Sequence, residues 1–217
     1  MDTSLSSATA HAEHQARLAR PRILWAAKSL YVERGVVAVS LADIARYLSV
    51  PESTVEQWFP SKEDLVQDVM EAHKANIHEA FLQHKESSRN AIEEMLAVRT
   101  WVRQEMYQSH NLFLGQVEAH YPASWQRWLD FRAGFLLDHV RTNLSWGISQ
   151  DLYRDNLNVD FLARLWLQQM GSLNTAAALG LDPAEAHHAL VDHFLSGIVT
   201  SAGAYVLRRL QEMPPFY

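Results

Sequence analysis

The sequence predicts an all-α protein with a small N-terminal domain of three helices and a larger C-terminal helical bundle. Three observations carry this prediction. Apolar residues recur at helical spacing over almost the whole chain after residue 17, enough for about nine to ten helices. Gly and Pro are scarce, 8 and 7 of 217 residues, which argues against a turn-rich all-β protein. We find no convincing strand pattern and no repeat of fixed period.

The boundaries of the N-terminal helices follow from residues typical of helix ends. Residues 1–16 are polar and are expected to form a mobile tail. A helix is then expected from residue 17 to the residue before Gly35, whose freedom suits a helix C-terminus. Ser40 is a plausible N-cap for a short helix, which ends before Val50-Pro51. A second short helix is expected over about 52–59.

Longer helices are expected over the rest of the chain. Ser61 with Asp64, Asn158, and Asp182 with Pro183 and Glu185 are typical of helix starts, and Gly180 of a helix end. The expected helices begin at Ser61 and then cover about 89–109, 111–120, 122–147, 158–179, a long segment from Asp182, and a terminal segment that ends before Pro214-Pro215. We place the domain boundary between residues 65 and 66, which gives domains of residues 17–65 and 66–217.

Composition excludes several classes of protein. The chain has no cysteine, which excludes a disulfide framework, a Cys-ligated zinc site and a thiol nucleophile. No apolar stretch approaches the roughly 18 residues of a membrane span, and no secretory signal opens the sequence. We therefore expect a cytoplasmic protein with no membrane partner. The formal net charge of −6 gives no general support for a nucleic-acid partner.

Residues 23–65 nevertheless carry a specific pattern that resembles the TetR family of bacterial transcriptional regulators. The matching residues are Ile23, Ala26-Ala27, Leu30-Tyr31, Glu33, Gly35, Ser40-Leu41, Ile44-Ala45, Val50, Thr54, Phe59 and Ser61-Lys62-Glu63-Asp64-Leu65. The resemblance implies a homodimer whose helix-turn-helix domain, residues 17–65, binds double-stranded operator DNA. It also implies that residues 66–217 dimerise and bind a small molecule, which releases the operator.

By the family pattern, the second short helix enters the major groove of DNA. The DNA-binding residues carried over are Arg17, Arg20, Ser40, Glu52, Ser53, Thr54, Glu56, Gln57, Trp58 and Lys62. Relatives usually have an aromatic residue where this chain has Glu56. Two carboxylates facing DNA are unfavourable unless each accepts a hydrogen bond from cytosine N4 or adenine N6. Residues 1–65 hold seven basic and eight acidic groups, so non-specific affinity should be weak.

A candidate ligand wall lies on the long helix after Pro122. At about 100° per residue, one face of this helix gathers aromatic side chains around an Arg and a His, as a largely apolar pocket with a few polar anchors requires. The candidate ligand-binding residues are Arg99, Trp128, Arg132, Phe135, His139, Trp146, Trp166 and Gln169. Arg99 and Arg132 together could hold a ligand carboxylate. A core stripe with satisfied polar members is the competing interpretation.

A dimer seam is expected on the helix that follows Asp182. Its face of mostly small residues, Ala186, Ala189, Leu190, His193 and Gly197, permits close approach of another helix. With the helix over 158–179 it would form a four-helix bundle across a two-fold axis.

Enzyme and metal sites find little support in the sequence. The eleven histidines include no set with metal-ligand spacing, and no nucleotide-binding or nucleophile motif occurs. We expect no enzyme activity, no catalytic residues, no metal and no cofactor. Three hypotheses remain: a ligand-released repressor, a TetR-like protein whose altered reading head acts through protein partners, and a helical-bundle enzyme.

Overall fold

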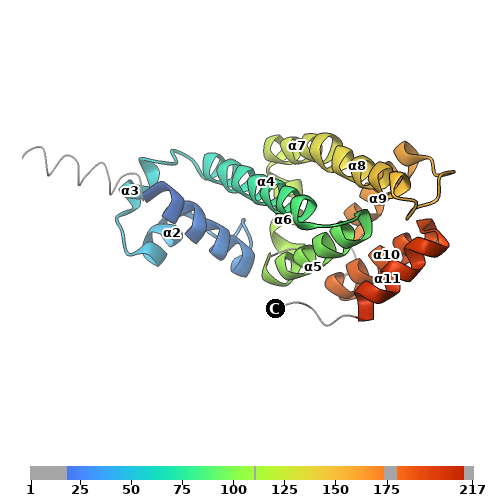
Figure 1. Cartoon of the computed structure of the whole chain (residues 1–217). Helices are drawn as coiled ribbons and strands as arrows, with labels where there is room; N and C mark the ends of the chain where they lie inside the picture. Colours follow the sequence, from blue (N-terminus) through green and yellow to red (C-terminus); the bar gives the residue numbers. More distant parts are fainter. Residues whose placement is uncertain (1–18, 110, 174–179, 213–217) are drawn as a thin grey trace, which may run out of the picture. The chain divides into compact units, whose positions relative to one another are not determined.

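The computed structural model describes residues 19–109, 111–173 and 180–212, and within these ranges it is all helical (Figure 1). No strand occurs there; Tyr153 and Val199 form an isolated antiparallel bridge. The all-α prediction is confirmed. None of the described helices combines the length and the apolarity of a membrane span. The tail expected over residues 1–16, and Arg17, lie outside the described residues.

The chain divides into two compact units. The first comprises residues up to 73 together with Leu112–Trp125, and the second comprises Lys74–Asn111 and residues from 126 onward. The three limits between the units fall within helices α4 (Lys62–Ser87) and α7 (Pro122–Phe131) and after the first residue of α6 (Asn111–His120). The separate functions expected for residues 17–65 and for residues 66–217 remain predictions.

The first unit is built on the predicted three N-terminal helices. The first helix is described over residues 19–34, and α2 (Leu41–Leu48) and α3 (Glu52–Glu56) follow. Helix α3 is shorter than the expected 52–59, because Pro60 disfavours a helical conformation in the residue before it. The start of α4 and most of α6 (Asn111–His120) complete the unit.

Gly35 joins the first helix to the loop before α2 in a way that only glycine permits. Its φ is +81°, and a Cβ there would lie 2.7 Å from Oε1 of Gln116. The same oxygen accepts a 2.9 Å hydrogen bond from the backbone N–H of Val37. The close approach of backbone to side chain therefore ties α6 to this loop.

The second unit contains five further helical segments around one apolar core. They are α5 (Ala91–Ser109), α8 (Leu137–Ser149), α9 (Val159–Ser172), α10 (Pro183–Ile198) and α11 (Ser201–Glu212). The core includes Ile92, Leu144, Tyr153 and Leu195, all almost fully buried. These residues come from α5, α8, the α8–α9 connection and α10, so the core holds together elements far apart in the sequence.

The helix expected over 122–147 contains a π-helical turn, η1 (Arg132–Leu136), between α7 and α8. A π turn adds a residue to the regular repeat. One extra residue rotates everything after it by about 100° relative to a regular wheel. The regular wheel used to predict a single face from Trp128 to Trp146 therefore does not hold across this turn.

The predicted helix starts are confirmed. Ser40 and Asp43 form a capping box, with the Ser40 hydroxyl accepting from the Asp43 N–H and the Asp43 carboxylate accepting from the Ser40 N–H. The hydroxyl of Ser61 accepts from the backbone N–H of Asp64. Asn158 and Asp182 accept from the N–H three residues onward at the starts of α9 and α10.

Candidate nucleic-acid interface and ligand site

Helix α3 presents a polar surface held in place by a buried side. Val55 and Phe59 are buried in the first unit and anchor the segment. The side chains of Glu52, Ser53, Glu56 and Gln57 are exposed, and those of Thr54 and Trp58 are half-buried. The predicted DNA-contacting side chains of this segment thus share an accessible surface, as a reading helix requires.

Helix α2 and its caps fix how the chain enters α3. Ser40 is used by the capping box at the N-terminus of α2. At the other end Ser49 has a φ of 56°, in the left-handed region, and its N–H bonds to carbonyls of the last turn. The short connection through Pro51 then leads into α3, which gives the helix-turn-helix arrangement.

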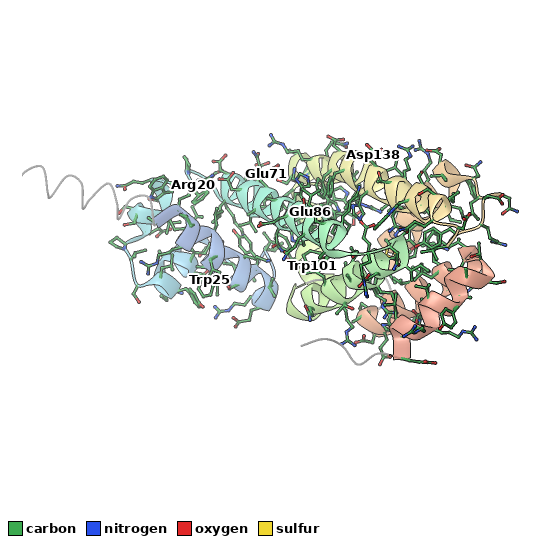
Figure 2. All side chains as sticks on the ribbon, in the orientation of Figure 1. Arg20, Trp25, Glu71, Glu86, Trp101 and Asp138 are labelled. Atoms are coloured by element: carbon green, nitrogen blue, oxygen red, sulfur yellow. The ribbon has the colours of Figure 1, made fainter. Side chains whose placement is uncertain are left out.

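The basic residues expected at phosphates make contacts within the first unit. The guanidinium of Arg20 pairs with Asp68 and lies 5.7 Å from the centre of the Phe59 ring. The Nζ of Lys62 donates a 3.2 Å hydrogen bond to the carbonyl of Val37. Burial lowers the pKa of Lys62, opposed by the charge of Asp43. Figure 2 shows Arg20 and the other described side chains on the ribbon. Both cations are therefore held in place by contacts within the unit.

Unlike these two cations, the carboxylates of Glu52 and Glu56 are not held by contacts with other described residues. Within the described part of the chain neither forms an ion pair or a hydrogen bond, and both are exposed. Arg46, which sequence reasoning did not select, is a cation in the last turn of α2. Its side chain is 76% exposed although it pairs with Asp43 at 2.7 Å. A basic residue in the last turn of a capped helix is the signal that would have indicated it.

In the second unit, an aromatic cluster joins the two sides of the π turn. Phe131 stacks on Trp128 and on Phe135, with ring centres 5.8 and 5.2 Å apart. Phe81 of α4 lies 4.7 Å from the ring of His139 and 6.3 Å from that of Phe135. Trp128, Phe135 and His139, three members of the predicted wall, thus lie in one cluster.

The other predicted ligand residues lie elsewhere. Arg99 pairs with Asp192 of α10 at 2.5 Å, whereas Arg132 donates a 2.7 Å hydrogen bond to the carbonyl of Leu167 in α9. The two guanidinium groups are thus engaged by different partners. Trp166 is buried in the core against Phe194, with ring centres 4.5 Å apart.

Gln169 is half-buried on α9, and Trp146 lines a separate pocket together with Lys85. The structure therefore does not gather the eight predicted ligand residues into one site.

Sequence reasoning missed a buried carboxylate beside the aromatic cluster. Glu94 of α5 is 1% exposed. Its Oε2 accepts a 2.7 Å hydrogen bond from Nδ2 of Asn143, and its Oε1 lies 3.2 Å from Nε2 of His139 without a well-aligned hydrogen bond. The hydroxyl of Tyr153 donates to Oδ1 of Asn143 at 3.3 Å. The local sequence has two adjacent glutamates, Glu93 and Glu94, and does not show which of them is buried.

Burial controls the charge of this pair. It raises the pKa of Glu94, opposed by the hydrogen bond from Asn143 and the charge of Lys85. Burial, with a smaller contribution from the charge of Lys85, lowers the pKa of His139 to about 4. His139 is therefore neutral at pH 7, and one of its ring nitrogens is an acceptor. A ligand in this region would meet aromatic rings and an uncharged imidazole.

The sequence of the first unit matches a known family. Residues 23–69 match the model for bacterial regulatory proteins of the tetR family. The chain carries a TetR-family N-terminal domain. The match spans the first helix, the helix-turn-helix of α2 and α3 and the start of α4, which are the elements that display the polar side chains described above. No curated protein sequence matches the chain significantly.

Solved structures extend the likeness to most of the chain. A TetR-family transcriptional regulator from Agrobacterium tumefaciens has a TM-score of 0.71 at 19% identity, over 85% of this chain and 100% of its own. Reduced NemR from E. coli has a TM-score of 0.70 at 16% identity, over 84% and 97%. FadR from Bacillus subtilis, solved with stearoyl-CoA, has a TM-score of 0.66 at 19% identity, over 82% and 99%. The chain therefore has the fold of a TetR-family transcriptional regulator.

Proposed function

We propose that the protein is a repressor that binds operator DNA as a homodimer and is released by a small, mostly apolar ligand. The observation that carries the proposal is the segment around α3. Buried Val55 and Phe59 fix it, so that a continuous polar surface faces outward within a TetR-family domain. A rigid, exposed helix of this kind suits the major groove.

The contacts on DNA follow from this placement. Glu52, Ser53, Glu56 and Gln57 would face base edges, with Thr54 beside them. Trp58, Lys62, Arg20 and Arg17 would lie at phosphates, as would the start of α2 at Ser40. Phosphate contacts position the protein, whereas base contacts select the sequence. With two carboxylates on the reading surface, the selected sequence should offer amino groups of cytosine or adenine.

The exposed surface of α9 and α10 supports the dimer. Phe161 and Leu165 of α9 are 61% and 40% exposed, although both are large and apolar. On α10 the exposed residues include Ala189, His193 and Gly197, and no atom lies within 4 Å of a Cβ built at Gly197. A partner helix could therefore approach closely, in agreement with the seam predicted on this face.

The aromatic cluster of the second unit supports the proposed class of ligand. Trp128, Phe135 and His139 offer a mostly uncharged surface, which favours a planar or acyl compound that is neutral or carries one anionic group. FadR binds stearoyl-CoA in its structure, and SmeT was solved with triclosan; both proteins share this fold. Thermal-shift screening of fatty acids, aromatic acids and cationic dyes tests this class. The ligand assignment is wrong if only cationic dyes stabilise the protein, or if His139→Ala responds to every hit like the wild type.

Fluorescence anisotropy with the labelled duplex upstream of the protein's own gene tests the proposal. At about 50 mM salt, binding should exceed that of a shuffled duplex by at least tenfold. Ser53→Asp adds a third acid to the exposed α3 surface and should weaken binding by tenfold or more. Ser201→Asp adds the same charge to an exposed site on α11 and should leave binding unchanged. Equal binding to both duplexes, or equal effects of the two substitutions, would contradict the proposal.

The second candidate function is that the helix-turn-helix domain binds protein partners instead of DNA. It is favoured by the exposed carboxylates of Glu52 and Glu56, which no described cation neutralises, because such a surface repels phosphates. Absence of binding to any duplex at low salt, with an intact dimer, would favour this candidate over the first.

A further inference from the structure

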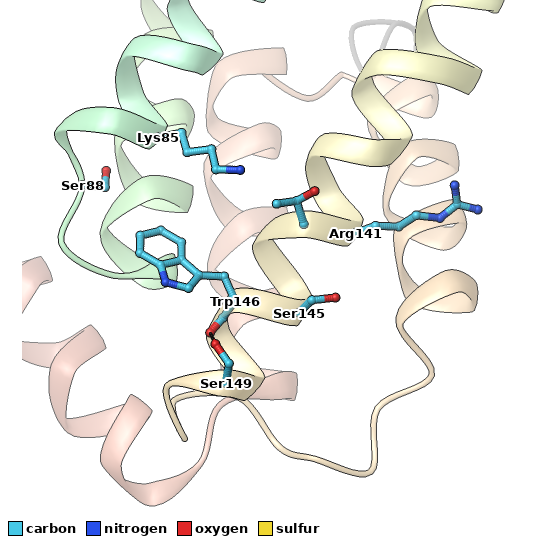
Figure 3. A pocket seen from close by; sticks show the side chains of 7 residues that line it. Lys85, Ser88, Arg141, Ser145, Trp146 and Ser149 are labelled. Carbon is cyan, nitrogen blue, oxygen red and sulfur yellow. Dashed lines mark hydrogen bonds between the residues drawn. The ribbon is translucent and has the colours of Figure 1, made fainter.

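The second unit has an open pocket of about 630 Å³ between the end of α4 and α8 (Figure 3). Lys85 and Ser88 line its α4 side, and Arg141, Thr142, Ser145, Trp146 and Ser149 line its α8 side. The pocket includes no member of the aromatic cluster that carries the proposed ligand. Its volume falls in the range of small-molecule sites.

Lys85 supplies the available positive charge. Its ammonium forms no hydrogen bond or ion pair with another described residue, and Figure 3 shows its side chain reaching toward α8. Arg141 is committed, because its guanidinium bonds Asp138 at 2.9 Å and also pairs with Asp160. In the view of Figure 3 it projects away from Lys85. The pocket therefore offers one accessible cation.

Hydroxyl groups line much of the pocket. Thr142 and Ser149 donate to carbonyls of α8, and Ser88 donates to the carbonyl of His84 in α4, so these three oxygens remain acceptors only. Ser145 is exposed and makes no hydrogen bond with another described residue, so its hydroxyl is free to donate. The single accessible ammonium of Lys85 suits a ligand with one anionic group.

Trp146 provides a flat apolar wall. The ring is half-buried and packs against the core of the second unit, so its position is fixed by that contact. Indole is large and rigid, and planar compounds stack on it favourably. A flat ligand would therefore lie on Trp146 with its charged group toward Lys85.

We propose that this pocket is a second binding site, for a flat aromatic compound that carries one carboxylate or similar anionic group. Lys85 holds the anionic group, and Trp146 holds the ring. The pocket shares no lining side chain with the aromatic cluster, although the charge of Lys85 also acts on Glu94 and His139.

Isothermal titration calorimetry with 2-naphthoate tests the proposal, with 2-naphthalenemethanol and 2-naphthylmethylammonium as neutral and cationic counterparts. The wild type should bind 2-naphthoate at least tenfold more tightly than either counterpart. Lys85→Met keeps the aliphatic stem and should weaken 2-naphthoate binding at least tenfold. Arg208→Met removes an exposed cation of α11 and should leave it unchanged.

A second variant separates the pocket from other sites on the protein. Ser145→Trp places bulk at an exposed position, so it should block the pocket without disturbing the core, and it should abolish 2-naphthoate binding. Phe135→Ala alters the aromatic cluster and should leave 2-naphthoate binding unchanged. The proposal is overturned if the wild type shows no binding, or if binding survives either Lys85→Met or Ser145→Trp. Binding lost only in Phe135→Ala would instead place the probe in the aromatic cluster.

Discussion

Nε2 of His139 lies 3.2 Å from Oε1 of Glu94, and both side chains are largely removed from water. The two residues come from α8 and α5 and lie beside the aromatic cluster that includes Phe81. Burial disfavours charge on both of them, since it lowers the pKa of His139 and raises that of Glu94. The imidazole of His139 is therefore uncharged at neutral pH, so its contact with Glu94 is not a salt bridge there.

His139 should make the protein sensitive to acid. Its folded pKa is about 4, below the value of 6.5 expected in the unfolded chain. As the pH falls from 7 to 5, the unfolded chain binds a proton that the folded chain excludes, so the free energy of unfolding decreases by up to about 2 kcal/mol through this group. Urea unfolding at the two pH values should show a smaller decrease for His139→Gln than for the wild type. His120→Gln, a change at an exposed residue of α6, should behave like the wild type; an equal decrease in all three proteins would refute the assignment.

Gly147 should tolerate no side chain. A Cβ at this position would lie 2.0 Å from Cδ2 of the buried Tyr153. Gly147→Ala should therefore lower the free energy of unfolding by about 3 kcal/mol or abolish folding. Gly115→Ala in α6 meets no atom within 4 Å and should raise it by about 0.5–1 kcal/mol. Urea denaturation measures both, and a mild effect of Gly147→Ala would mean that Tyr153 is not fixed against α8.

Phe161 should contribute to the dimer. Its side chain is 61% exposed on α9, and burying it against a partner would remove apolar surface from water. Phe161→Glu should shift the protein from dimer to monomer at micromolar concentration, as measured by light scattering. Tyr205→Glu alters a side chain that is 58% exposed on α11 and should leave the dimer intact. A monomeric wild type, or a dimer unaffected by Phe161→Glu, would contradict this interface.

Glu56 should oppose binding to random DNA. Its carboxylate is exposed on α3, has no counter-ion among the described residues, and would face phosphates. Glu56→Tyr should therefore raise affinity for shuffled duplexes several-fold and lower discrimination in anisotropy titrations. Glu118→Gln removes an exposed acid from α6 and serves as the control. Unchanged or reduced affinity for every sequence would show that Glu56 is off the interface or reads a specific base.

Local features of the fold could be predicted from the sequence. Ser40, Asn158 and Asp182 cap the helices assigned to them, because a cap depends only on residues within the next turn. The π turn at Arg132–Leu136 could not be predicted this way. A helical wheel assumes a constant 3.6 residues per turn, and no residue type in this segment signals the departure from it.

Some features of the candidate site could likewise be predicted from the sequence, and others could not. The exposure of Glu52, Ser53 and Glu56 follows from a short family pattern, which the sequence contains. The burial of Glu94 depends on Asn143 and His139, more than forty residues away, so no local signal reveals it. For the same reason, the separate partners of Arg99 and Arg132 were not predicted, because Asp192 and Leu167 belong to other helices.

Hydroxyl-radical footprinting on the duplex upstream of the protein's own gene tests the central claim most directly. A dimer with one α3 per subunit predicts two protected half-sites of related sequence, with centres one helical turn, about 34–36 Å, or more apart. Protection of both half-sites should be lost together in Ser53→Asp and retained in Ser201→Asp. Protection of a single unrepeated segment, or no protection at a concentration where the protein is dimeric, would contradict the account.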